Sequence, residues 1–349
     1  MKCMIVGDTH FEDGPDGYLD AQLECLAKLV KEIKPSTLFF LGDIFHHRKP
    51  TPTCIVKVLK CIKNLSYFHT TYILRGNHDS ANKSDNEETI LDVFSLGSDA
   101  SVVKCNTYFD RANICFLPHY ENEDTTIEFL KKVKLRKGSL TLGHVGFDGC
   151  MTIANDYTFK INKDLFNGQT ILGHIHRYAD HGNVKFLGTP WATNFGEADQ
   201  KHYVGVIDWD VHAGTFKDME LVEVTHGPRY MVLPYDSLEV YKDEINSKDH
   251  YTLLRVTINK FSEENSSDMK SQILSKYNVK HLDIRFEPIY DKKLNNRISD
   301  YDPQRAIESL SDSIIDKYLE EQKSSIPTEE LKKGLDEINT YADSQSKDK

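Results

Sequence analysis

The sequence predicts a layered α/β fold followed by a smaller α/β unit. Three observations lead to this prediction. Short apolar runs alternate with helical patterns through the first 227 residues. With 349 residues, of which 39% are hydrophobic and 28% charged, the chain is longer than one ordinary core. The pair Gly227-Pro228 then interrupts the alternation. We expect a main domain at residues 1–227, a small domain at 228–298 and a C-terminal helical segment at 299–349.

Eight short apolar runs are the expected strands of the main domain. They cover residues 3–6, 37–41, 71–74, 114–117, 140–142, 170–172, 184–187 and 203–207. Two helical patterns follow the first two runs. In one, Leu19, Leu23, Leu26 and Val30 recur at helical spacing, and the other runs over residues 55–65 behind a Thr51-Pro52 start signal.

The chain beyond residue 227 predicts a small β-α-β unit and two terminal helices. The unit comprises a strand at 251–258, a helix near 268–277 and a strand at 281–286. Asp302-Pro303 opens the last helical stretch, which is interrupted near Pro327 and resumes to about residue 342. Both helices carry an apolar stripe, made of Ile307, Leu310, Ile314 and Tyr318 and of Leu331, Leu335, Ile338 and Ala342. These stripes pack either on the chain's own core or on a partner.

Charge and composition limit the classes of protein to consider. The formal net charge of -11 weakly disfavours a generic nucleic-acid binder, because phosphate contacts are normally made by lysine and arginine. Residues 300–349 carry about half of this excess, and bound cations would add positive charge at a catalytic site. We find no run long enough for a membrane span and no signal peptide. The seven cysteines form no CxxC pair, which favours a reducing cytoplasm.

Five short polar motifs follow predicted strands. They are Asp8-Thr9-His10, Gly42-Asp43, Gly76-Asn77-His78-Asp79, Gly143-His144 and Gly173-His174-Ile175-His176. Each motif alone is common, and a single histidine is more often a core or surface residue than a ligand. Their joint occurrence at strand ends predicts one ligand-binding site. The glycines would let the backbone turn sharply and approach the site closely.

The residue types in these motifs suit a pair of divalent metal ions. Two such ions can supply a nucleophile for phosphodiester hydrolysis and neutralise charge at phosphorus. Asp43 is the expected bridging carboxylate. Asp8, His10 and His176 are expected on one metal, and Asn77, His144 and His174 on the other. A spacing of two residues would place both histidines of the last motif on one face of a strand end. Mixed imidazole, amide and carboxylate ligands favour manganese, iron or zinc over magnesium, and we expect manganese.

The motifs resemble those of calcineurin-like metallophosphoesterases and, over roughly residues 1–210, those of SbcD-type nuclease subunits. His46 stands three residues after Asp43, as in the nucleases, and the segments 187–191 and 195–197 resemble the region after the last metal motif. The resemblance implies a sandwich of two mixed sheets flanked by helices, with a small α/β capping domain and C-terminal helices. It also implies a manganese-dependent DNA endonuclease and exonuclease of repair, recombination and replication.

The same resemblance implies roles for residues beside the ligands. His78 would act on the transition state and the leaving oxygen, a task suited to general acid catalysis. His46 would help to seat the phosphate backbone, and residues 47–49 either continue that contact or form a solvated turn. Asp79 either orients the imidazole of His78 or caps a helix. The lysine-rich stretch 131–137 is interpreted as a solvated helix face in preference to a DNA groove.

The resemblance also implies partners. DNA ends, hairpins and single strands would be the substrates, and the capping domain would contact duplex DNA. The C-terminal helices would dock on an SbcC-like ATPase of the SMC family, in a heterotetramer built on a nuclease homodimer in the cytoplasm of a bacterium or a phage-infected host. Two alternatives remain: an enzyme of small phosphodiesters or nucleotides, and a scaffold without catalysis. A scaffold predicts lost ligands, and none of the seven is missing.

Overall fold

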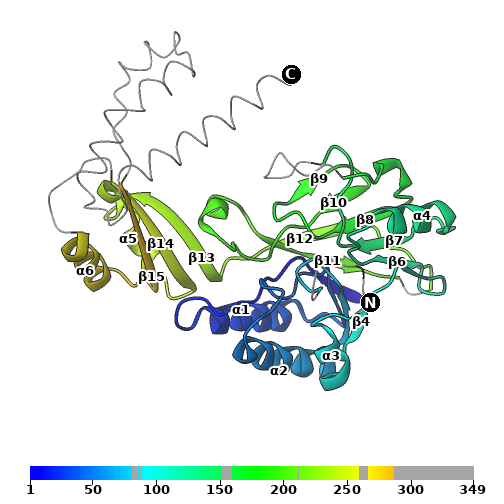
Figure 1. The fold of residues 1–349 in the computed structure, drawn as a ribbon, viewed down its shortest axis with the longest axis horizontal. Helices are drawn as coiled ribbons and strands as arrows, with labels where there is room; N and C mark the ends of the chain where they lie inside the picture. Colours follow the sequence, from blue (N-terminus) through cyan, green and yellow to red (C-terminus); the bar gives the residue numbers. More distant parts are fainter. Residues whose placement is uncertain (81–84, 86–87, 151–158, 211, 259–265, 287–349) are drawn as a thin grey trace, which may run out of the picture. The chain divides into compact units, whose positions relative to one another are not determined.

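The structure is a computed structural model that describes residues 1–80, 85, 88–150, 159–210, 212–258 and 266–286 (Figure 1). In this part of the chain, two six-stranded sheets are present. The first has the order β12 (Met219–Glu223), β11 (Tyr203–Asp208), β1 (Lys2–Val6), β2 (Thr37–Phe40), β3 (Thr70–Leu74) and β4 (Ser101–Val103). The second has the order β5 (Thr107–Phe109), β6 (Ile114–Leu117), β7 (Leu140–Gly143), β8 (Gln169–Leu172), β10 (Val184–Phe186) and β9 (Ala179–Asp180). Both sheets mix parallel and antiparallel pairs.

The two sheets pack face to face, and helices cover their outer faces. Alternation along β1 shows this arrangement: Cys3 and Ile5 share a buried cluster with residues of the second sheet, whereas Met4 and Val6 share one with helices. The helices on the first sheet are α1 (Tyr18–Ile33), α2 (Pro52–Phe68) and α3 (Asp92–Gly97), and Figure 1 shows them along one side of it. Helix α4 (Asp124–Lys132) covers the second sheet. The expected sandwich of two mixed sheets flanked by helices is therefore confirmed.

A third, three-stranded parallel sheet forms the small α/β unit. It consists of β13 (Gly227–Pro234), β14 (His250–Ile258) and β15 (His281–Phe286), with α5 (Lys242–Ile245) and α6 (Ser266–Lys276). Three 3-10 turns complete the described elements: η1 (Lys163–Leu165), η2 (Phe195–Glu197) and η3 (Tyr235–Ser237). The hydroxyl of Tyr251 on β14 donates to the carbonyl oxygen of Asp16, at 2.7 Å, which fixes this sheet to the segment before α1.

All eight predicted strands and both predicted helices of the main domain are present. The small unit contains the expected strand, helix and strand, and in addition β13, which the sequence interpretation missed. This strand begins at the Gly227-Pro228 pair that marked the expected domain boundary. It lies at the edge of its sheet, where a proline without an amide hydrogen is tolerated. The expected helices at 303–342 lie outside the described residues. No helix in the described ranges is long and apolar enough to cross a membrane.

Candidate metal centre

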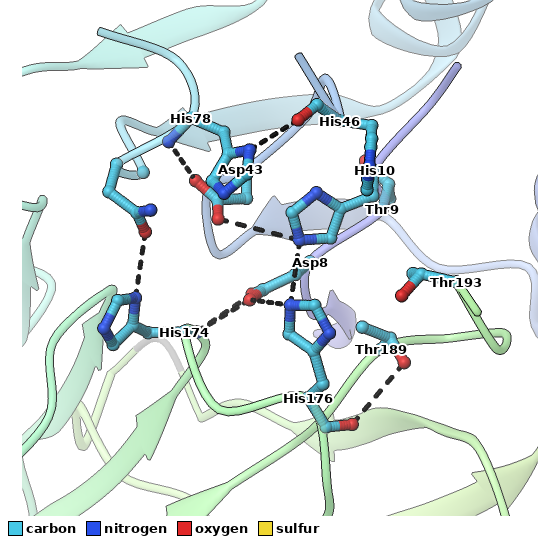
Figure 2. Close-up of polar contacts among 12 residues, drawn as sticks. Asp8, Thr9, His10, Asp43, His46, His78, His174, His176, Thr189 and Thr193 are labelled. Atoms are coloured by element: carbon cyan, nitrogen blue, oxygen red, sulfur yellow. Dashed lines mark hydrogen bonds and ion pairs between the residues drawn. The ribbon is translucent and has the colours of Figure 1, made fainter. Parts of the chain in front are cut away.

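The five motifs meet because they follow strands that are neighbours in their sheets. β1, β2 and β3 are adjacent and parallel in the first sheet, and β7 and β8 are adjacent and parallel in the second. The carboxyl ends of parallel strands lie at the same edge of a sheet, so their loops converge. Figure 2 shows the side chains of these loops pointing toward one another.

The first group of ligand atoms comes from Asp8, His10 and His176. The Nε2 atoms of the two histidines lie 3.0 Å apart, and the Nε2 of His176 lies 4.0 Å from Asp8 Oδ2. All three ligand atoms lie within 4.8 Å of one another. Asp8 is fully buried, and both of its oxygens accept from the backbone amide of His174.

The second group comes from Asn77, His144 and His174. The Oδ1 atom of Asn77 lies 2.9 Å from His144 Nε2 and 2.9 Å from His174 Nδ1. The two ring nitrogens are 3.2 Å apart. These atoms carry lone pairs that would repel one another unless a proton or a cation lies among them.

Asp43 lies between the two groups. Its Oδ2 atom is 3.7 Å from His10 Nε2 and 3.5 Å from His144 Nε2, so one carboxylate faces both sets of ligands. Its Oδ1 atom accepts from the backbone amide of His78, at 2.7 Å. This is the position that a bridging carboxylate requires.

Hydrogen bonds outside the centre prepare two of the imidazoles for a metal. His144 donates from Nδ1 to the carbonyl oxygen of Leu41, at 2.8 Å, and His176 donates from Nδ1 to Glu197 Oε1, at 2.8 Å. Each bond places the lone pair of Nε2 toward the centre, as partners of metal-binding histidines usually do. With four imidazole nitrogens, an amide oxygen and two buried carboxylates among its donors, the centre fits a pair of divalent cations of the manganese, iron or zinc type.

Two buried carboxylates and the imidazole of His144 shift one another's pKa at the centre. Burial favours the neutral form of His144, but Asp43 and Asp8 outweigh it and raise its pKa to about 10. Burial alone would raise the pKa of Asp43, yet His144 and His10 keep it well below its ordinary value. Burial raises the pKa of Asp8 to about 6. A bound cation would neutralise the same carboxylates, and His144 would release a proton to bind it through the lone pair of Nε2.

The backbone at the centre adopts conformations that most residues avoid. Positive φ angles occur at His10 (43°), Asp43 (47°) and His174 (77°). β8 ends at Leu172, so His174 and His176 lie on a loop, and the expected two-residue strand alternation does not place them. At Gly42 (φ 106°) a Cβ atom would lie 2.6 Å from His144 Nδ1, which explains the need for glycine there.

Comparison with known proteins identifies the family. The profile described as calcineurin-like phosphoesterase matches residues 1–178. The chain belongs to this family. Protein 244L of Invertebrate iridescent virus 6, provisionally named a phosphoesterase, is 23% identical over 62% of this chain and 79% of its own length. Exonuclease subunit 1 of Enterobacteria phage T4 is 22% identical over 70% of this chain and 75% of its own. Among solved structures, a nuclease named MPE from Pseudomonas putida matches with 16% identity and a TM-score of 0.32, covering 58% of this chain and 82% of that one.

His78 and His46 lie beside the centre of this phosphoesterase. The ring of His78 is 4.9 Å from that of His10, and its Nδ1 donates to the carbonyl oxygen of His46 (Figure 2). Asp79 has neither of its two expected roles, since it neither orients His78 nor caps a helix. Its two oxygens accept from the amides of Ile44 and Gly76, which ties the loops after β2 and β3 together. The backbone carbonyl of His46, and not Asp79, therefore orients the imidazole of His78.

Two residues at the phosphoesterase centre were not assigned from sequence. Glu197 was noted only within a resembling segment, yet it is buried and bonds His176. His119 follows β6, as the ligand motifs follow their strands, and its ring stacks on His174 with centroids 5.7 Å apart. Burial lowers the pKa of His119 to about 4, so it is neutral at physiological pH. Its place after a buried strand was the one signal that could have identified it.

Proposed function

We propose that this chain is a two-metal DNA endonuclease and exonuclease, the nuclease subunit of an SbcCD-like repair and recombination complex. The observation that carries the proposal is the position of Asp43 between two groups of ligand atoms. Family membership supports phosphoesterase chemistry, and the likeness to a phage exonuclease subunit supports DNA as the substrate.

Seven residues would hold the metals: Asp8, His10 and His176 on one ion, Asn77, His144 and His174 on the other, and Asp43 on both. The bound ions would supply charge neutralisation at phosphorus and a nucleophile at neutral pH. The nitrogen-rich ligand set favours manganese over magnesium, which prefers oxygen ligands and retains its waters.

His78 is the proposed acid for the leaving oxygen. Because a carbonyl oxygen only accepts, His78 uses Nδ1 as a donor to His46, and its Nε2 remains for the substrate. As a general acid, His78 would donate a proton from Nε2 to the leaving oxygen. His46 borders both His10 and His78, at ring distances of 5.3 and 6.1 Å, where it would help to seat the phosphate backbone.

The third sheet would contact duplex DNA next to the metals. Phe195 lies two residues before Glu197, the partner of His176, and the guanidinium of Arg255 on β14 lies 4.1 Å above its ring. The sheet thus reaches the immediate neighbourhood of the centre. Removing residues 229–290 should weaken duplex cleavage more than hydrolysis of a small diester, and equal losses on both substrates would contradict this role.

A partner ATPase of the SbcC type would bind the helices expected after Pro303, within a heterotetramer built on a nuclease homodimer in the cytoplasm. Truncation after residue 298 should abolish copurification with the ATPase and leave hydrolysis of a small diester intact. Undiminished copurification would place the contact elsewhere.

Cleavage assays test the nuclease proposal directly. Duplex ends, hairpins, single strands and a chromogenic diester would be offered with manganese or magnesium, with and without the ATPase. We expect manganese-dependent degradation of DNA. Hydrolysis of the small diester or of nucleotides without DNA cleavage, even with the ATPase present, would identify a small-molecule phosphodiesterase instead.

A further inference from the structure

A second group of metal-binding residue types lies beside the centre and takes no part in the two ligand sets. Glu12, His46 and His47 place one ligand atom each within 4.8 Å of one another. The Oε2 atom of Glu12 is 3.8 Å from the Nε2 of His46 and 3.8 Å from the Nε2 of His47. The two imidazole rings are 4.7 Å apart, and the ring of His46 is 5.3 Å from that of His10.

The backbone holds these three side chains together. Phe11 and Phe45 form a parallel bridge, in which the amide of Phe11 donates to Ile44 and the amide of His46 donates to Phe11, at 2.8 and 3.1 Å. The bridge joins the segment after β1 to the segment after β2, so Glu12 lies alongside His46. The amide of Glu12 also donates to the buried side chain of Gln22 on α1. The group is therefore positioned before any ligand arrives.

The charges of the group favour a cation. Within the described residues, the two imidazoles are the only basic side chains within 4.0 Å of the Glu12 carboxylate. Asp13 is next in sequence and adds negative charge nearby. The side chains of Glu12, His46 and His47 are 19%, 32% and 67% exposed, so an ion from solvent can reach them.

We propose that Glu12, His46 and His47 form a third divalent-cation site next to the two-metal centre. One carboxylate and two imidazoles are a common set for zinc and related ions, with remaining positions open to water or substrate. Two ligand atoms that each lie about 2.1 Å from an ion are about 3.4 Å apart in a tetrahedral arrangement and at most about 4.2 Å apart. The observed separations of 3.8 Å fall within this interval.

Two simpler arrangements compete with a cation. Protonated imidazoles could form ion pairs with Glu12, or they could bind a phosphate directly, although the carboxylate between them would repel an anion. A bound cation would instead attract the phosphate next to the scissile one, a consequence that rests on the proposed nuclease function. It would also offset the acidic net charge of the chain where the substrate backbone must approach.

The test counts zinc ions bound to the full chain. Metal-free protein would be saturated with zinc, freed of excess by gel filtration and analysed by mass spectrometry for bound metal. The variants are Glu12→Gln and His47→Gln, and the matched control is His212→Gln, which changes an exposed histidine away from the group. We expect the wild type and the control to bind one more equivalent than either variant. The unfolding temperature of the metal-free variants should equal that of the wild type.

Crystals of the wild type soaked in zinc provide a second, independent measurement. Anomalous density between Glu12, His46 and His47 would support the proposal, and density confined to the seven-residue centre would overturn it. Equal zinc counts in the wild type and both variants would also overturn it. If the seven-residue centre binds no metal, the result is different from both of these outcomes. The wild type would then bind one equivalent of zinc, and both variants would bind none.

Discussion

Replacing Glu197 by glutamine would remove the charge that orients His176 while keeping the size of the side chain. Four donors converge on this carboxylate. They are the Nδ1 of His176 (2.8 Å), the amide and hydroxyl of Thr193 (2.8 and 3.1 Å) and the side-chain amide of Asn194 (3.0 Å). Burial alone would raise the pKa of Glu197, but the bond from His176 keeps it below its ordinary value. The group is therefore a carboxylate at neutral pH.

A glutamine cannot satisfy these donors. Its single oxygen can face either His176 or the amide of Thr193, and its NH2 group then meets a donor on the other side. A hydrogen bond to a charged group contributes about 1.5–3 kcal/mol, and loss of the partner of a metal-binding histidine usually weakens metal affinity about tenfold to a hundredfold, or about 1.4–2.7 kcal/mol. The two free-energy ranges agree. We therefore expect Glu197→Gln to weaken binding of the metal on Asp8, His10 and His176 about tenfold to a hundredfold.

Competition with a chelator of known affinity measures this effect, with manganese added to metal-free protein. The matched control is Glu223→Gln, the same chemical change at an exposed carboxylate that pairs with Lys201 at 3.0 Å. Manganese in excess should restore most of the hydrolysis rate of Glu197→Gln. An unchanged manganese affinity in Glu197→Gln would falsify the role assigned to the hydrogen bond.

Three further outcomes are expected. His78→Ala should slow cleavage about a hundredfold to ten-thousandfold. It should keep its metals, because Asp43 is bound by the backbone amide of residue 78, and loss of metal would contradict the acid role. Because the pKa of His144 is about 10, metal binding near pH 8 should release a proton, and metal affinity should rise with pH between about 7 and 9. Calorimetry in buffers of different ionisation heat would measure the released proton. Metal binding without proton release would refute this expectation. Gly42→Ala should lower the free energy of unfolding by about 1–3 kcal/mol more than the control Gly182→Ala. Gly182 also has a positive φ, 82°, but a Cβ atom there would have no other atom within 4 Å. Equal denaturant midpoints for the two variants would exclude crowding at Gly42.

Local sequence patterns predicted eight strands of the two large sheets and the residues that converge at their edge, and the family resemblance implied the two-sheet sandwich. Buried strands of a parallel sheet are apolar on both faces, so they appear in the sequence as continuous runs. Loops after such strands meet at one edge, so the polar motifs could be placed together without a structure. The seven expected ligands do lie together, in the two groups expected, with Asp43 between them.

Elements without a distinctive pattern were missed. Strand β13 was missed because it begins with the Gly227-Pro228 pair, which was interpreted as a boundary, and β12 was missed because its side chains are all intermediate or exposed. The carboxylate of Asp79 was expected either to orient His78 or to cap a helix, yet its partners are backbone amides of two loops. Backbone amides carry no sequence signal, since every residue except proline has one.

Sequence by itself determined which residue types stand at the strand ends and that their chemistry suits metals. Tertiary structure alone decided how those residues are supported. Glu197 reaches His176, His119 stacks on His174, and Glu12 lies against His46 only because packing brings distant segments together. Hydrophobic periodicity reports which face of an element is buried, whereas a hydrogen bond between distant side chains depends on the relative position of two elements, which periodicity does not encode.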